Sequence, residues 1–117
     1  MSMLTDFFTL AGGTIAGRAY PNVAPAAPVT PYLTYFRVSA AEDNTVDTNG
    51  GAGNLVNTRL QVDVWGSTYA QAQASADALK AALKGWLWQN LVINEQDLYE
   101  PDTKLHRALI ELSIWHT

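Results

Sequence analysis

The sequence predicts an α+β fold, a single domain in which a mainly antiparallel sheet of about four to five strands packs against two helices. The chain has 117 residues, and 48% of them are hydrophobic, which is enough for one buried core. Two segments show helical periodicity, and several others are rich in β-branched and aromatic residues. The elements follow in the order helix, strand, strand, long loop, strand, helix, strand, strand. This order lacks the regular alternation of strand and helix that is typical of doubly wound α/β proteins.

The N-terminal part of the chain predicts a helix, a short strand and a crossover. Apolar residues recur at helical spacing over residues 3–11, and Gly12 with Gly13 is expected to end that helix. Residues 14–20 are predicted to form a short strand. Residues 21–31 contain four prolines, each of which lacks a backbone donor and fixes φ. This stretch is therefore predicted to be an extended, proline-rich crossover.

The central part predicts two strands joined by a long loop. Residues 32–39 are rich in β-branched and aromatic side chains and predict the first of these strands. Residues 40–54 are polar and end in a glycine-rich run, so they are predicted to be a flexible loop; a loop of this length in a small domain is often functional. Residues 55–65 alternate apolar with polar side chains, which indicates a strand with one buried and one exposed face.

The second predicted helix covers residues 69–84. Its apolar stripe is narrow and rich in alanine, so the helix can lie close to the sheet. Thr68 and Gln71 have the spacing of a capping box at its start. Gly85 is the expected cap at its C-terminal end.

Two more strands are predicted after this helix. Residues 90–94 form the first, and residues 104–116 form a long final strand whose apolar and polar side chains alternate. The acidic stretch between them, residues 95–102, is predicted to be a link or a bulged turn. A further strand at residues 98–99 is left open.

Charge and composition exclude several classes of function. The formal net charge is −4, from seven Lys and Arg against eleven Asp and Glu. Proteins that bind nucleic acid need a dense basic patch, so a nucleic-acid-binding function is disfavoured. No apolar run of about 18 residues is present to span a membrane, and residues 1–11 lack the basic start of an export signal. The chain has no cysteine, which excludes disulfides, thiolate metal sites and cysteine nucleophiles.

The residues that could carry chemistry give no catalytic, metal-binding or cofactor-binding site. His106 and His116 lie ten residues apart on one predicted strand, too far apart to share a metal ion, so structural or surface roles are expected. The carboxylates of residues 95–102 could act as acid and base or hold a divalent ion, but a solvated turn is favoured. Because no nucleophile, base and orienting group converge, an enzyme is disfavoured and no cofactor is expected.

Two groups of residues stand out as a candidate assembly interface. One is the long loop, because a flexible segment can become ordered when subunits associate. Its candidate residues are Asp43, Asp47, Asn49, Gly50, Gly51, Gly53 and Asn54. The other group is Trp65 with Trp115, which fall on the mostly polar faces of their strands. Either a helix, such as the N-terminal one, covers that face, or the two rings line an oligomer contact, where tryptophan concentrates binding energy.

Six segments, taken in order over nearly the whole chain, resemble the small tail-completion proteins of long-tailed bacteriophages. Two carry most of the resemblance. They are Leu-Gln-Val-Asp-Val-Trp before the alanine-rich helix and Asp-Leu-Tyr-Glu-Pro before the last strand. The other matching stretches are residues 18–21, 31–35, 68–70 with 76–79, and 109–115.

This resemblance implies a structural role in a virion, with no catalytic residues to carry over. Such proteins resemble tail terminators, which cap the finished tail tube, stop its growth and offer a surface to the head connector. The resemblance implies a hexameric ring in the phage or prophage tail, formed in the host cytoplasm during assembly. Its implied partners are further copies of itself, the tail tube protein and the head-completion or connector protein, with DNA passing through without specific binding and no membrane contact. A non-enzymatic adaptor domain of an unrelated pathway is the alternative.

Overall fold

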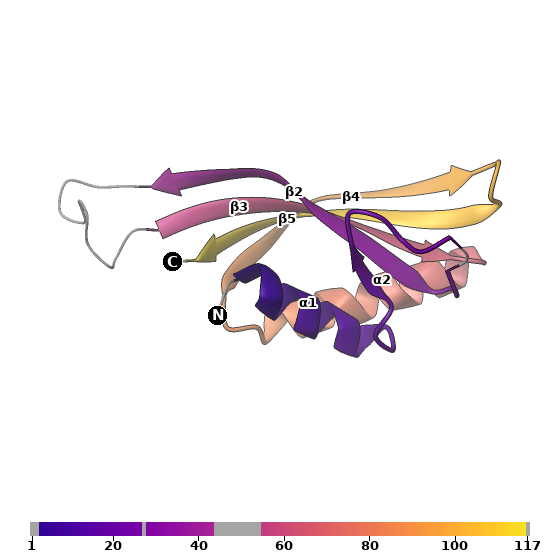
Figure 1. The fold of residues 1–117 in the computed structure, drawn as a ribbon, viewed down its shortest axis with the longest axis horizontal. Coiled ribbons are helices and arrows are strands. Elements are labelled where there is room, and N and C mark those ends of the chain that lie inside the picture. The colour runs from indigo at the N-terminus through magenta and orange to yellow at the C-terminus, as the bar shows by residue number, and fades with distance from the viewer. Residues whose placement is uncertain (1–2, 27, 44–54, 117) are drawn as a thin grey trace.

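The computed structural model describes residues 3–26, 28–43 and 55–116, and it confirms the α+β fold (Figure 1). Within these residues the helices are α1 (Met3–Thr14) and α2 (Tyr69–Lys84). The strands are β1 (Ala19–Pro21), β2 (Tyr32–Asp43), β3 (Leu55–Gly66), β4 (Gln89–Glu100) and β5 (Leu105–His116).

The described strands form one sheet in the order β1-β2-β3-β5-β4. β1 runs parallel to β2 and pairs only with the segment from Leu33 to Tyr35, whereas all the other neighbouring strands are antiparallel. Arg18 reinforces the parallel pair, because its Nε donates to the carbonyl oxygen of Pro31 at 2.7 Å. The carbonyl of Arg18 also accepts from the N–H of Leu33 at 3.0 Å. The sheet is therefore mixed but mainly antiparallel, as the sequence predicts.

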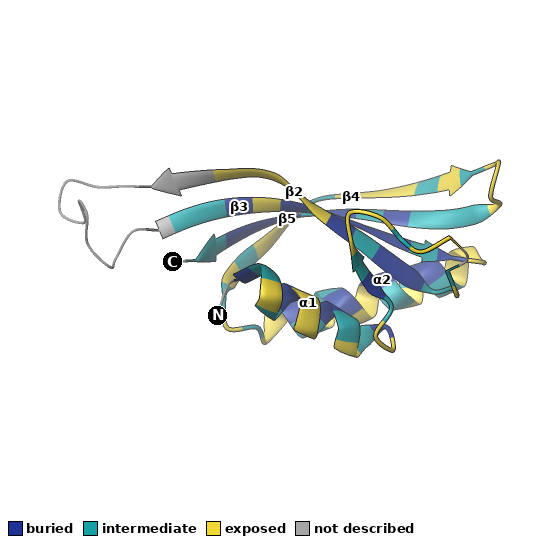
Figure 2. Cartoon of the chain, in the orientation of Figure 1, coloured by how far each residue is buried: buried dark blue, intermediate teal, exposed yellow. Residues whose placement is uncertain are grey.

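The core lies between the sheet and the helices, which both cover the same face (Figures 1 and 2). Phe7 of α1 is fully buried, and its ring lies 5.0 Å from that of Tyr35 and 5.9 Å from that of Trp86, centroid to centroid. The alternation predicted for β3 and β5 is confirmed, because their even-numbered side chains face the helices. The buried apolar members of this set are Leu60, Val62, Val64, Ala108, Ile110, Leu112 and Ile114.

The start of α2 is fixed by its cap and by a close approach to β3. Thr68 Oγ1 accepts from the N–H of Gln71 at 3.1 Å, which confirms the predicted N-cap. The Gln71 side chain departs from a standard capping box, since its Oε1 accepts from the N–H of Ser67 at 2.7 Å. Gly66 ends β3 against the first turn of the helix, where a Cβ atom would lie 2.6 Å from the backbone nitrogen of Ala72. The chain can turn this tightly only because that position has no side chain.

The predicted end of the first helix is wrong by about one turn. α1 continues through Gly12 and Gly13 to Thr14. Its packing explains the extension, because Ala11 and Ile15 are both buried in the core on either side of the glycines. The helix ends where Gly17, at φ +79°, donates its N–H to the carbonyl of Gly12 at 2.8 Å.

The predicted bounds of three strands are also wrong. The strand predicted over residues 14–20 is only the short β1, because α1 continues to Thr14 and β2 offers β1 only three partners. β2 continues past residue 39 to Asp43, because β3 supplies antiparallel partners as far as Asp43 opposite Leu55. β4 runs unbroken through most of the stretch predicted as a link, because β5 offers it a partner strand of the same length. The turn lies instead at residues 101–104, where the N–H of Lys104 donates to the carbonyl of Glu100 at 2.7 Å.

Candidate functional site

The two histidines lie at opposite ends of β5 and are held by aromatic and hydroxyl neighbours. The His106 ring lies 4.9 Å from that of Tyr99. His116 Nε2 lies 2.7 Å from Thr58 Oγ1, and its ring lies 6.0 Å from that of Trp88. Among the described residues, no three His, Cys, Asp or Glu side chains are close enough together to hold a metal ion. No described helix is both long and apolar enough to cross a membrane.

The sheet face opposite the helices carries a cluster of aromatic and charged side chains centred on Trp65. Its indole stacks on Tyr32 of β2 at 6.0 Å between ring centroids, with an interplanar angle of 14°. Arg107 of β5 is the residue paired with Trp65 across the two strands. Its guanidinium lies 5.2 Å from the centroid of the Trp65 ring. Trp65 Nε1 donates to Thr34 Oγ1 at 3.3 Å. These contacts tie β2, β3 and β5 together across the helix-free face.

Asp63 lies beside this cluster and is almost fully covered, with 5% of its surface exposed. Its carboxylate accepts from Gln61 Nε2 at 3.3 Å and lies 3.9 Å from Arg107 Nη1. Burial raises the pKa of Asp63 above its ordinary value, against the opposing effects of the Gln61 hydrogen bond and the Arg107 charge. Arg107 also pairs with Glu100 at 3.6 Å, so the two acids share one guanidinium.

Two of the acidic side chains of β4, Glu95 and Asp97, bind α2. Asp97 accepts from Gln73 Nε2 at 2.6 Å and from the Tyr69 hydroxyl at 3.1 Å. About two turns farther along α2, Lys80 Nζ lies 2.6 Å from Glu95. The hydrogen bond to Glu95 raises the pKa of Lys80. These two carboxylates therefore connect β4 to α2, and the sequence interpretation of this stretch as a solvated turn is wrong for residues 95–100.

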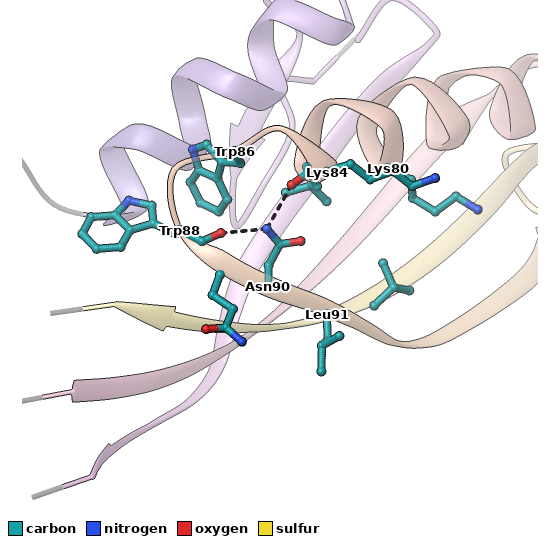
Figure 3. A pocket seen from close by; sticks show the side chains of 9 residues that line it. Lys80, Lys84, Trp86, Trp88, Asn90 and Leu91 are labelled. Atoms are coloured by element: carbon teal, nitrogen blue, oxygen red, sulfur yellow. Dashed lines mark hydrogen bonds between the residues drawn. The ribbon is translucent and has the colours of Figure 1, made fainter.

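A solvent-open hollow of about 400 Å³ lies between the end of α2 and the start of β4 (Figure 3). Asn90 forms its floor, donating from Nδ2 to the carbonyl of Leu83 at 3.1 Å and to that of Trp88 at 2.9 Å. Lys80 and Lys84 stand along its α2 wall. The residues that line the hollow include no carboxylate, imidazole or hydroxyl, and its two ionisable groups are the amines of Lys80 and Lys84.

Two long strand edges of the described sheet have no partner strand. β4 is the terminal strand on one side along its whole length. On the other side, β1 covers only residues 33–35 of β2, which leaves the rest of β2 unpaired on its outer side. We call residues 36–40 the β2 edge and residues 91–93 the β4 edge. Both carry exposed apolar side chains, including Val38 at 50% exposure and Leu91 at 61%.

Comparison with known proteins assigns the chain to a family. Residues 8–117 match the family described as "Tail completion protein gp17". The chain belongs to this family. It is therefore a structural component of the tail of a phage-like virion, and the family is not one of enzymes.

A solved structure shares the fold of this tail completion protein. A chain of the structure titled "Virion of native gene transfer agent (GTA) particle" superposes with a TM-score of 0.70 at 13% sequence identity. The match covers 97% of this chain and 93% of that one. No curated protein matches the sequence significantly.

The candidate interface residues of the tail completion protein are brought together only in part. Asp43 is the last residue of β2 and pairs with Leu55. The candidates Asp47, Asn49, Gly50, Gly51, Gly53 and Asn54 lie outside the described residues.

Trp65 and Trp115 are half-buried on the helix-free face. The alternative in which the N-terminal helix covers that face is wrong, because α1 packs on the opposite side with Phe7 in the core. Sequence reasoning missed the two strand edges. A signal for the β4 edge was present, since residues 89–94 hold no charged side chain.

Proposed function

We propose that this tail completion protein caps the finished tail tube, stops its growth and joins the tail to the head connector. The observation that supports this role is the extent of the family match, which covers both helices and all five described strands apart from the start of α1. The matched region is thus the whole α+β unit, and the described residues outside it form no second unit with a function of its own.

We propose that it acts as a ring of identical copies, six in number. A cap on a tube that admits DNA must surround a passage, and a closed ring of copies provides one. Six copies at a formal net charge of −4 carry 6 × −4 = −24. A passage through so acidic a ring lets DNA move without being held, because the positive contacts that bind phosphates are few.

We also propose residues of the long loop and two tryptophans as contacts in the assembled tail. Residues 43–54, with Trp65 and Trp115, are offered as contacts to neighbouring copies, the tail tube protein or the head connector. The loop residues carry acidic and amide side chains and no basic one. Trp65 and Trp115 offer aromatic surface on the helix-free face, which suits a protein contact.

Removal of the gene from a strain that produces the particles tests this function. Electron microscopy of the resulting lysate is expected to show tails of excess length and heads without attached tails. A plasmid copy of the gene is expected to restore normal particles, and this restoration controls for effects on neighbouring genes. Particles with normal, attached tails in the absence of the protein would contradict the proposed function.

A further inference from the structure

We propose that copies of this protein join edge to edge, with the β2 edge of one copy forming an antiparallel strand pair with the β4 edge of the next. The inference rests on the proposed ring and names the contact that builds it. The occupant of each edge is thus a second copy of the same chain, and the sheet continues from copy to copy.

The backbone along the two edges is open to pairing with another strand. An unpaired strand edge presents a row of N–H and C=O groups that can pair with another strand. Natural proteins usually block such edges with charges or by covering them. The β4 edge has no charged residue, and the β2 edge has only Arg37. By contrast, the second half of β4 carries Glu95, Asp97 and Glu100, so the part of β4 open to pairing is its first half.

The directions of the two edge strands also suit this contact. β2 and β4 run in opposite directions in the sheet, because three antiparallel pairings separate them (Figure 1). Rotation about a ring axis that lies roughly along the strands leaves those directions unchanged. The β4 strand of one copy therefore meets the β2 strand of the next in antiparallel orientation, which is the more stable form of pairing.

The two apolar edges lie at the same height along the strands of the sheet. The register through β3 and β5 places Arg37, Leu60, Leu112 and Val92 in one row. A β-bulge follows this row on β2 and another interrupts β4 beside it, and the bulged residues are Val38 and Ile93. Both are exposed, at 50% and 42%. A closed ring has no rise along its axis, so residues at one height meet around it.

The charges beside the two edges are complementary. Arg37 pairs with Leu60 of the core, so it lies on the helix-bearing face, where it is exposed and forms no ion pair with any described residue. Glu95 lies on the same face, two rows from the row of Arg37, and its side chain is half-exposed even with Lys80 bound. Diagonal neighbours of this kind are roughly 7–8 Å apart across a strand pair, within reach of an arginine.

A second copy fits these features better than an unrelated partner does. The charge beside each edge is opposite to the charge beside the other edge of the same chain. The β2 edge offers a positive charge and apolar side chains, and the β4 edge offers apolar side chains next to a negative charge. Because the two edges differ, the contact is heterologous, and repetition of it closes a ring when the rotation permits.

Cysteine cross-linking tests the contact directly, since the chain has no cysteine of its own. The variant carries both Val38→Cys and Ile93→Cys and replaces the normal protein in assembled particles. Because β3 and β5 separate the two positions within one copy, a disulfide between them must join two copies. Oxidation is expected to give a ladder of linked species on a non-reducing gel, ending at the full ring.

Matched variants separate the possible outcomes. Each single cysteine variant is expected to give no linked species, because the contact joins unlike edges. The pair Val38→Cys with Thr103→Cys, whose second cysteine lies in the exposed β4–β5 turn, is the control for chance collision. Dimers from a single-cysteine variant, or a double variant that links no more than the control pair, would overturn the proposed contact.

A charge exchange provides a second test that does not depend on disulfide geometry. Arg37→Glu and Glu95→Arg are each expected to reduce the fraction of normal tails, and the double exchange is expected to restore it. Arg59→Glu changes the charge of an exposed residue on the inner strand β3 and is expected to have no effect. Failure of the double exchange to restore tails that each single exchange impairs would contradict the contact. Normal tails in Arg37→Glu, in Glu95→Arg and in the double exchange would also contradict the contact.

These tests can fail independently of the proposed function. Defective tails in the gene deletion together with no edge-specific links would remove the edge contact and leave the capping role in place. Edge-specific links together with normal tails in the deletion would remove the capping role and leave the self-association in place.

Discussion

Asp63 combines burial with a shared cation on the helix-free face, and its protonation is coupled to folding. Burial raises its pKa in the folded protein, so over the pH range between its ordinary pKa, near 4, and the raised value, the folded state binds more protons than the unfolded state. The free energy of unfolding therefore falls as the pH rises through this range. The Arg107 contact offsets only part of the cost, because Glu100 shares the same guanidinium.

Asp63→Asn removes this coupling and keeps the shape of the side chain. Relative to the variant, the normal protein is expected to lose stability as the pH rises from about 4 to 7. Urea unfolding at both pH values measures the difference, and Asp102→Asn in the exposed β4–β5 turn is the control for loss of a carboxylate. A difference between the normal protein and Asp63→Asn that moves the other way with pH would contradict the assigned shift.

Gly66 is required by a close approach of backbone atoms. In Gly66→Ala the added methyl group would lie 2.6 Å from the nitrogen of Ala72, and neither strand nor helix can move aside without loss of contacts. We expect a loss of about 1–3 kcal/mol in the free energy of unfolding. Gly85→Ala is the matched control, because no atom lies within 4 Å of its added Cβ. Equal thermal unfolding temperatures for the two variants would show that β3 and α2 are not packed as described.

Single residues also show where sequence reasoning reaches its limit. The odd face of β3 could be derived from alternation, so Trp65 was placed on it correctly. Its partners could not be derived, because Tyr32 and Arg107 are distant in sequence and become neighbours only through the strand order. Their pairing depends on register, which alternation alone does not specify.

At the scale of elements, long strands are decided by their partners more than by their own composition. The acidic segment 95–102 has low intrinsic strand preference, yet residues 95–100 form strand because β5 pairs with them and α2 binds their carboxylates. α2 itself was predictable to the residue, since its cap and its periodicity are local in sequence. β2 and β4 were predicted too short, because the length of a partner strand is not a local property.

Asp97→Ala is expected to loosen the second half of β4 from α2. The variant loses the bonds from Gln73 and Tyr69, while the pairing of β4 with β5 remains. Amide hydrogen exchange is therefore expected to speed up locally in residues 95–100, with little change in the global unfolding temperature. Asp102→Ala in the adjacent turn is the control. Unchanged local exchange in Asp97→Ala would show that these two bonds do not hold β4 in place.

At the scale of the whole molecule, the surfaces that hold the fold differ from those that we propose for binding. The helix-bearing face of the sheet is buried in the core. On the helix-free face, the side chains of the cluster around Trp65 contact one another. The two strand edges are the surfaces that we propose for assembly. The fold class and the structural role could be predicted from the sequence, whereas the edges became visible only once the strand order was known.

Charges placed on the β4 edge test this separation of roles. Leu91→Lys with Ile93→Lys changes two exposed side chains, so the unfolding temperature is expected to stay close to normal. Incorporation of the protein into tails is expected to be lost, because lysine on an edge opposes strand pairing. Leu87→Lys, at a still more exposed position in the α2–β4 connection, is the control and is expected to assemble normally. Normal tails with both edge lysines would contradict the assignment.

The central claim is that copies of this protein close into a ring at the head end of the tail through their sheet edges. A cryo-electron microscopy reconstruction of that junction tests it most directly. We expect a closed ring of identical copies in which residues 36–40 of one copy lie one strand spacing, roughly 4.8 Å, from residues 91–93 of the next. A ring whose copies meet through other surfaces with both edges facing solvent, or a junction without such a ring, would contradict it.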